Sequence, residues 1–237
     1  MLNEKNILIP DIDDVSNAFV ITIDDKRYEM FCDIFDFYGI PIPQKFEGVK
    51  CDNGVIGCSK SHYSVVKLAK ERNLPYVMIY EDDVFPRNDC LEHFFYSMEN
   101  VPKDWDFLKL EDIHIEQYDI TYDVNDYWFR GKVGGGSGTG CYIIRESGYD
   151  MFIRQYDNCG FHYPSDLILC DLMKNPFIKF YIQKKLCFLQ HNIHGCKTMH
   201  TNLFNWSKQK YLAKYYSDDV ENFDVSYYMS HRLKIDK

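Results

Sequence analysis

The chain has 237 residues, of which 46% are hydrophobic, and this length supports a globular unit with a substantial core. The 27 Lys and Arg against 36 Asp and Glu give a net charge of -9, which argues against nucleic acid as a partner, because nucleic-acid-binding surfaces need a basic stripe. No stretch has the roughly 18 consecutive apolar residues of a membrane-spanning helix, and the N-terminus lacks the basic and apolar segments of a signal peptide.

Predicted strands and helices alternate in the N-terminal half. Residues 17–23 are a β-branched apolar run that predicts a strand, and residues 27–38 carry apolar side chains at helical spacing. A second helix is predicted at 57–72 and a buried strand at 74–80. The acidic cluster Glu81–Asp83 follows this strand directly. Because ligands of open α/β sheets bind at the carboxyl ends of the strands, we expect a functional site there.

The remaining sequence predicts further elements of both kinds. Strands are expected at 105–110, 141–144 and 177–182. Helices are expected at 90–98, at 147–156 and from Ser165 onward, with Ser165 as the N-cap. Residues 111–125 look loop-like, and the most glycine-rich segment is 132–140. Together these elements predict an α/β fold.

The acidic cluster carries the clearest chemical signal. Three consecutive carboxylates at a strand end repel one another unless a cation or hydrogen-bond donors neutralise them. Oxygen ligands of this kind select Mg²⁺ or Mn²⁺, and phosphates of a substrate can fill the remaining positions around such an ion. An acidic chain can therefore still bind an anionic nucleotide. The alternative is a solvated acidic turn that caps the following helix.

The order of these segments resembles glycosyltransferase family 25, the lipooligosaccharide galactosyltransferase type. The motifs that carry the resemblance are VITI at Val20–Ile23, Gly57-Cys58 with Ser61-His62, EDDV at Glu81–Val84, Gly138-Thr139-Gly140 with Tyr142, and Pro164-Ser165-Asp166. The resemblance implies a GT-A-type, Rossmann-like nucleotide-sugar-binding fold over residues 1–204, with a mixed central sheet flanked by helices. It also implies a Mn²⁺ or Mg²⁺ ion, a UDP-sugar donor that is often UDP-galactose, and inversion at the anomeric carbon. Residues 205–237 do not align with the family and are expected to form a C-terminal helical extension.

The resemblance also assigns roles to individual residues. Asp83 is the expected metal ligand, together with His191 or His194. The donor-binding residues that it implies are Thr22, Arg27, Ser61, His62, Glu81, Asp82, Gly138, Thr139 and Gly140. Asp166 is the expected general base of an inverting transfer, with Asp112 as the second candidate.

Each role has an alternative that the sequence leaves open. His62 is equally compatible with a core histidine bonded to backbone, Arg27 with an exposed residue at a helix start, and Asp166 with an acidic first turn. The glycines near Gly138 also fit a mobile loop. A zinc site built from the cysteines and histidines of residues 187–200 is a weaker possibility, because the spacing fits no standard zinc module.

The expected setting follows partly from the cysteines. Nine scattered cysteines without CxxC pairs predict reduced thiols, as in a cytoplasmic protein. The resemblance adds a saccharide or lipid-linked saccharide as acceptor, in lipooligosaccharide or polysaccharide biosynthesis at the inner face of the membrane. The aromatic and basic residues after 205 fit either a peripheral membrane contact or an ordinary packing helix. Two other functions stay open: a catalytically silent carbohydrate-binding protein of the same fold, and a metal-dependent phosphoester hydrolase.

Overall fold

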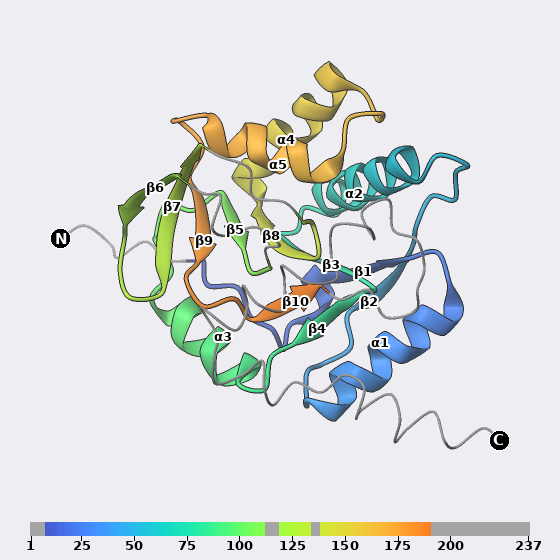
Figure 1. Cartoon of the computed structure of the whole chain (residues 1–237), viewed down its shortest axis with the longest axis horizontal. Helices are drawn as coiled ribbons and strands as arrows, with labels where there is room; N and C mark the ends of the chain where they lie inside the picture. Colours follow the sequence, from blue (N-terminus) through green and yellow to red (C-terminus); the bar gives the residue numbers. More distant parts are fainter. Residues whose placement is uncertain (1–7, 112–118, 134–137, 191–237) are drawn as a thin grey trace. The chain divides into compact units, whose positions relative to one another are not determined.

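The computed structural model describes residues 8–111, 119–133 and 138–190, which form a mixed α/β fold (Figure 1). The strands of the central sheet are β1 (Ala18–Thr22), β2 (Gln44–Glu47), β3 (Tyr76–Glu81), β5 (Phe107–Lys109), β6 (Asp119–Asp123), β7 (Trp128–Val133), β8 (Cys141–Arg145) and β9 (Phe180–Gln183). A separate two-stranded ribbon pairs β4 (Val84–Pro86) with β10 (Phe188–Gln190). The helices are the short 3₁₀ helix η1 (Val15–Asn17) and the α-helices α1 (Asp25–Phe37), α2 (Gly54–Glu71), α3 (Cys90–Glu99), α4 (Glu146–Cys159) and α5 (Ser165–Lys174).

The strand order in the sheet is β2-β1-β3-β8-β5-β9-β7-β6. The pairs β1–β2, β1–β3 and β5–β9 are parallel, whereas β8 runs antiparallel to both of its neighbours, β3 and β5. At the other edge, β7 pairs antiparallel with β9 and β6. The expected mixed central sheet flanked by helices is therefore confirmed.

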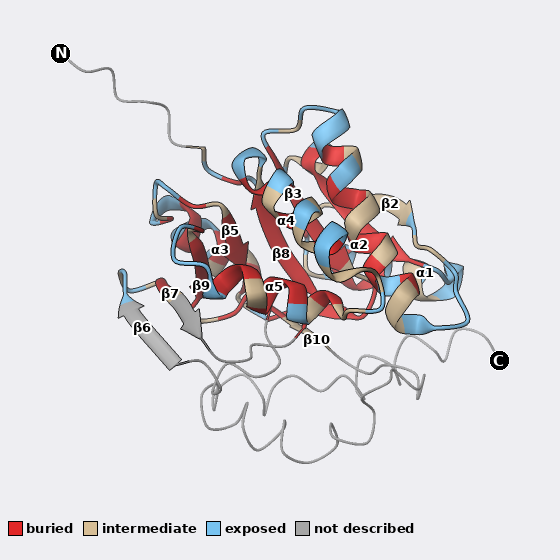
Figure 2. Ribbon diagram, turned by 90° about the horizontal axis from the view of Figure 1, so that it is seen from above, coloured by how far each residue is buried: buried red, intermediate tan, exposed pale blue. Residues whose placement is uncertain are grey.

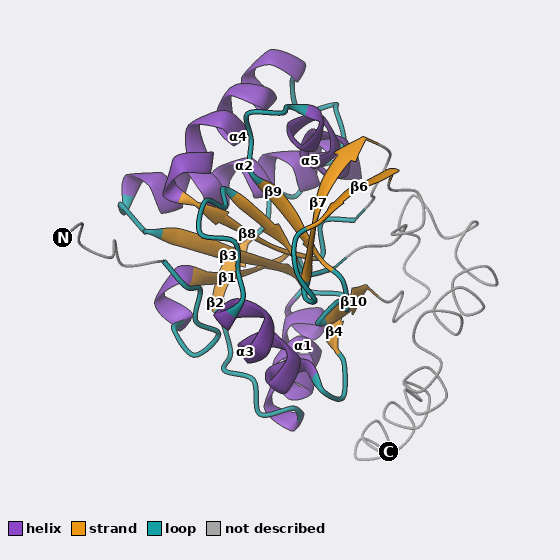
Figure 3. Cartoon of the chain, turned by 90° about the vertical axis from the view of Figure 1, so that its left-hand side faces the viewer, coloured by secondary structure: helices purple, strands orange, loops and turns teal. Residues whose placement is uncertain are grey.

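Helices cover both faces of the sheet. Figures 1 and 3 show α2, α4 and α5 together on one face, and α1 and α3 on the other. The inner strands are buried along their length, as the burial colours of Figure 2 show. An extensive apolar cluster fills the space under α2, α4 and α5 and includes Val65 and Phe152 from helices and Ile79 and Ile144 from strands. This layer fixes α2 against the sheet, which matters for the site described below.

Most predicted elements are confirmed, and two predictions were wrong. The stretch 111–125 was expected to be a loop, but β6 occupies 119–123 at the sheet edge, where its DITYD sequence alternates polar and apolar side chains. Ser165 was expected to cap α5, but Pro164 holds the N-cap position and Ser165 is the first helical residue. The hydroxyl of Ser165 is buried and turned toward Ser59 on α2, so it does not satisfy the helix end.

Three further expectations concern membrane-spanning helices, the cysteines and the C-terminal extension. Among the described residues, no helix is both long and apolar enough to cross a bilayer. The eight cysteines in the described part of the chain are all free thiols. The helical extension expected at 205–237 lies outside the described residues.

Candidate functional site

The acidic cluster stands where β3 leaves the sheet, and strand geometry decides which way Glu81 points. Side chains alternate between the two faces of a strand, so Glu81 shares a face with Val77 and Ile79, which belong to the apolar cluster under α2. On α2, His62 lies on the same inward-facing side as Val65. The partly buried carboxylate and the buried imidazole therefore meet between sheet and helix.

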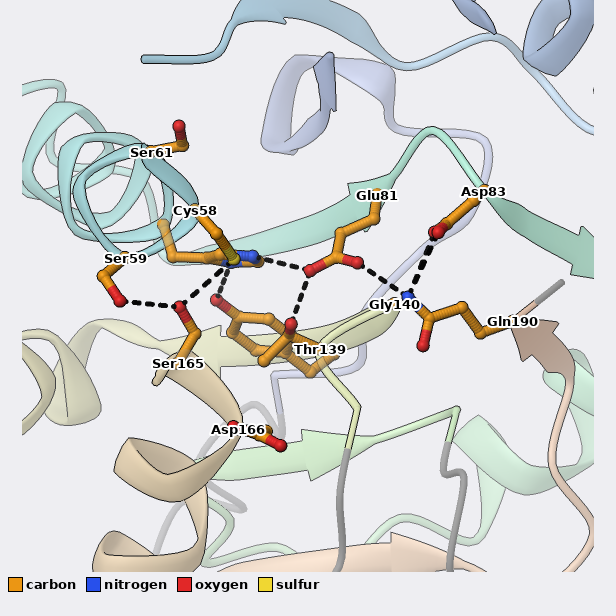
Figure 4. Close-up of polar contacts among 12 residues, drawn as sticks. Cys58, Ser59, Ser61, Glu81, Asp83, Thr139, Gly140, Ser165, Asp166 and Gln190 are labelled. Atoms are coloured by element: carbon orange, nitrogen blue, oxygen red, sulfur yellow. Dashed lines mark hydrogen bonds and ion pairs between the residues drawn. The ribbon is translucent and has the colours of Figure 1, made fainter. Parts of the chain in front are cut away.

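Glu81 lies at the centre of the polar network in Figure 4. Its Oε1 lies 2.9 Å from His62 Nε2 and accepts a 2.5 Å hydrogen bond from the Thr139 hydroxyl. Its Oε2 accepts a 2.9 Å hydrogen bond from the side-chain amide of Gln190. Three segments that are distant in sequence, α2, the residues before β8 and the end of β10, thus converge on one carboxylate.

His62 is held from both ring nitrogens. Its Nδ1 lies 2.7 Å from the hydroxyl of Tyr142, whose ring stacks against the imidazole with a centroid separation of 5.7 Å. Burial opposes a charge on this ring, but Cys58 and Glu81 beside it outweigh that effect and raise the pKa of His62 to about 10. In this arrangement His62 is a positively charged partner that keeps Glu81 ionised.

Arg27 faces the other two carboxylates of the cluster. Asp24 caps α1 by accepting the backbone N–H groups of Lys26 and Arg27, and this cap places Arg27 in the first helical turn. The guanidinium forms an ion pair with Asp82 and lies 3.6 Å from Asp83. Asp82 and Asp83 are almost completely buried, so the carboxylate side of this ion pair is shielded from solvent, whereas Arg27 is partly exposed.

Two carboxylates of the cluster have raised pKa values. Burial, followed by the charge of Glu81, raises the pKa of Asp83 from 3.8 to about 7. Burial also raises the pKa of Asp82, although Arg27 and a hydrogen bond from Thr22 act in the opposite direction. A carboxyl group that keeps its proton near neutral pH marks a position where an added cation would be favourable.

The glycine segment reaches the site from β8. Gly138 has a φ of 101°, a conformation that favours glycine, and Thr139 and Gly140 follow it toward the acidic cluster. The Gly140 carbonyl accepts the N–H of Glu81, and its own N–H donates to Glu111 over 3.2 Å. A Cβ at Gly140 would lie only 2.6 Å from a methyl group of Val84, so no larger residue fits without displacement.

Two expected site residues lie outside this network. The Ser61 hydroxyl donates to the carbonyl of Gly57 over 2.7 Å and accepts the N–H of Val49 over 2.8 Å, so it joins α2 to the preceding loop. In Figure 4 Ser61 points away from Glu81. Asp166 lies in the first turn of α5, is partly exposed and accepts the N–H of Leu167.

Several other candidates fall outside the described residues, namely Asp112, His191, His194, Cys196 and His200. Cys187, the first member of the weaker zinc possibility, is buried. Its backbone N–H donates to Gln183, and its thiol donates to the carbonyl of Cys90.

Two sets of side chains within the described residues could bind a cation. Glu81, Asp82 and Asp83 offer only oxygen ligands, which suits Mg²⁺ or Mn²⁺, but the three do not form a group whose ligand atoms all lie within 4.8 Å of one another. Cys58, His62 and Glu81 place one sulfur, one nitrogen and one oxygen within 4.8 Å of one another, a set closer to the preference of zinc. In the second set, however, His62 already uses one ring nitrogen for Glu81 and the other for Tyr142.

Sequence reasoning missed Gln190 and gave no role to Tyr142 or Glu111. Tyr142 belongs to the quoted glycine motif, so its spacing after Gly140 was an available signal. No sequence signal pointed to Gln190, because only the pairing of β10 with β4 brings this residue beside Asp83.

Comparison with known proteins identifies a family. Residues 40–169, more than half of the chain, match the family model described as "Glycosyltransferase family 25 (LPS biosynthesis protein)". A search of curated proteins found no match to the chain.

A search of solved structures found distant similarities. A glycosyltransferase involved in glycosylation of the major capsid of PBCV-1 has 9% identity and a TM-score of 0.42, over 73% of this chain and 91% of that chain. Mouse xyloside xylosyltransferase 1 has 6% identity and a TM-score of 0.41, over 70% of this chain and 84% of that chain. A Drosophila β1,4-galactosyltransferase 7 in complex with manganese, UDP-Gal and xylobiose has 13% identity and a TM-score of 0.33, over 57% of this chain and 50% of that chain.

Proposed function

The chain belongs to glycosyltransferase family 25, and we propose that it is a metal-dependent, inverting enzyme that transfers galactose from UDP-galactose to a carbohydrate acceptor. Glycosyl transfer itself follows from the family. The metal, the donor and the stereochemical course are the proposal. The observation that carries it is the acidic cluster Glu81–Asp83 at the carboxyl end of a strand, where Asp82 and Asp83 are buried and the pKa of Asp83 is raised to about 7.

The residues at this cluster fit a hard divalent cation. Asp83 is buried, has a pKa raised to about 7 and lies beside Glu81, so a cation between these two carboxylates would relieve their repulsion. We assign Asp83 and Glu81 as the protein ligands. When bound, Mn²⁺ or Mg²⁺ would stabilise the negative charge that develops on the departing diphosphate.

Arg27 and the glycine segment are the proposed donor-binding groups. Arg27 is partly exposed and already faces the carboxylates, so its guanidinium can turn to the diphosphate of the donor. Gly138, whose φ of 101° favours glycine, is the position where we expect the donor to approach the backbone closely. Asp82, held by Arg27 in the free chain, would become available to the ribose hydroxyls of the donor.

The chemical step is a single displacement. The acceptor hydroxyl attacks the anomeric carbon, a new glycosidic C–O bond forms, and the C–O bond to UDP breaks on the opposite face. A base must take the hydroxyl proton, and we assign this role to Asp166, whose partly exposed carboxylate an acceptor can reach. Asp112 is the second candidate.

The proposed acceptor is a saccharide or lipid-linked saccharide of lipooligosaccharide or polysaccharide biosynthesis. A cytoplasmic enzyme would meet such an acceptor at the inner face of the membrane. The family description names lipopolysaccharide biosynthesis, which supports this setting.

The test is a panel of UDP-sugars and saccharide acceptors, with the product linkage read by NMR. Transfer from UDP-galactose with inverted configuration, lost in Asp166→Asn but not in Asp171→Asn on the same helix, would support the proposal. Retained configuration would overturn the single-displacement course. Donor hydrolysis without transfer to any acceptor would favour a hydrolase, and binding without turnover would favour a silent carbohydrate-binding protein.

A further inference from the structure

The side-chain amide of Gln190 points between two carboxylates of the acidic cluster. Its Nε2 lies 2.9 Å from Glu81 Oε2, and 3.2 Å and 3.3 Å from the two oxygens of Asp83 (Figure 4). An amide nitrogen has two hydrogens, so at least one of them is shared between two acceptors. Three oxygens from two carboxylates thus surround one NH₂ group with partly positive hydrogens, as they would surround a small cation.

The backbone of Gln190 is firmly placed. Gln190 pairs with Val84, the residue after Asp83, in the antiparallel ribbon of β10 and β4. Two residues earlier, the buried ring of Phe188 contacts Tyr80 with a centroid separation of 5.3 Å. The main chain at position 190 is therefore fixed, and any rearrangement at this position is a change in side-chain orientation.

A divalent cation between Glu81 and Asp83 cannot share their oxygens with N–H groups that point at the same lone pairs. The last side-chain bond of glutamine has a broad and nearly two-fold rotational preference, so the torsion itself opposes a turn of the amide only weakly. The contacts that the turn breaks at Glu81 and Asp83 are replaced by contacts of these carboxylates with the cation. Turning exchanges the nitrogen for the carbonyl oxygen, a ligand that Mg²⁺ and Mn²⁺ accept.

We infer that Gln190 is a switching residue of the metal site: its amide N–H groups hold Glu81 and Asp83 together in the metal-free protein, and its carbonyl oxygen ligates the divalent cation once that cation binds. This inference rests on the proposed cation at Glu81 and Asp83. It adds a ligand that the sequence motifs do not contain, and it explains why β10 ends beside the acidic cluster.

Titration of the full-length chain with Mn²⁺, followed by the EPR signal of free Mn²⁺, tests the inference without any measurement of activity. Gln190→Leu keeps the approximate size of the side chain but has no oxygen ligand, and we expect it to weaken Mn²⁺ binding by about tenfold. Gln190→Glu restores an oxygen and should bind Mn²⁺ at least as tightly as the wild type. The matched control is Gln155→Leu on α4, where the amide contacts only Cys159 among the described residues and Mn²⁺ binding should not change.

The sign of the change in Gln190→Leu decides the outcome. If the amide only competes with the cation, its removal tightens Mn²⁺ binding, and this result or an unchanged affinity would overturn the inference. Gln190→Met provides a second variant of similar length if the leucine variant does not fold, with the same expected loss. Absence of Mn²⁺ binding in the wild type would overturn the proposed metal site itself, which separates that failure from the failure of Gln190 alone.

Discussion

His62 Nε2 lies 2.9 Å from Glu81 Oε1, so a buried residue of α2 holds the first carboxylate of the acidic cluster. Tyr142 fixes the opposite ring nitrogen, and the imidazole therefore has one orientation. This contact joins the motif Gly57-Cys58 with Ser61-His62 to the EDDV motif, and it gives His62 a positioning role.

The first prediction concerns this positioning role. His62→Ala should lower kcat/KM by about 10- to 100-fold and weaken Mn²⁺ binding, because Glu81 loses its charged partner. His62→Gln retains a donor for Glu81 and should recover part of the loss. Steady-state kinetics with a Mn²⁺ titration measures both effects, and a folded His62→Ala with wild-type values would exclude the role.

A second prediction is the pH dependence of metal binding. The pKa of Asp83 is raised from 3.8 to about 7 in the folded chain, so ionisation of Asp83 destabilises the metal-free fold as pH rises through this interval. Mn²⁺ must displace that proton at low pH, and its binding should strengthen between pH 6 and pH 7.5. The increase in Tm caused by Mn²⁺ should therefore be larger at pH 7.5 than at pH 6, and it should vanish in Asp83→Asn. An equal increase at both pH values would contradict the role of Asp83.

Ser61 provides a third prediction, about stability. Its hydroxyl is the partner of the Val49 N–H and of the Gly57 carbonyl, so Ser61→Ala should lower the free energy of unfolding by about 1–3 kcal/mol. Urea denaturation measures this loss. The KM of the same variant for the sugar donor separates a structural role from a donor-binding role. A large increase in this KM would support the donor-binding role that the family resemblance implies, and an unchanged KM would leave Ser61 with the structural role alone.

Gly140 provides a fourth prediction. A Cβ there would lie 2.6 Å from Val84 and 3.1 Å from Glu111, so Gly140→Ala should destabilise the fold by about 1–3 kcal/mol through overpacking. Gly54→Ala is the matched control, because a Cβ at Gly54 meets nothing within 4 Å. If Gly140→Ala and Gly54→Ala had equal free energies of unfolding, the tight packing around Gly140 would be contradicted.

Local sequence patterns predicted the elements that carry strong periodicity. The β3 strand, the helix α2 and the acidic cluster between β3 and β4 all follow from apolar spacing and from charges at a strand end. The short strands β4 and β10 were missed, because three residues are too few to show alternation. Edge strands such as β6 carry many polar side chains and therefore resemble loops in sequence.

The site was predictable where it is local in sequence and unpredictable where it depends on tertiary pairing. Glu81 and Asp83 are adjacent to a recognisable strand, and the family motifs pointed to His62 and Thr139. The position of Gln190 is set by pairing across more than a hundred residues, which no local pattern reports. Polar contacts of this kind are visible only once the chain is folded.

The most direct test of the central claim is UDP release from UDP-galactose, with and without Mn²⁺, in the wild type and in Asp83→Ala. A metal ligand at Asp83 predicts that the wild type releases UDP only with Mn²⁺ and that Asp83→Ala loses this activity while it remains folded. Full UDP release by Asp83→Ala, or equal release by the wild type without a divalent cation, would contradict a metal-dependent transfer at the acidic cluster.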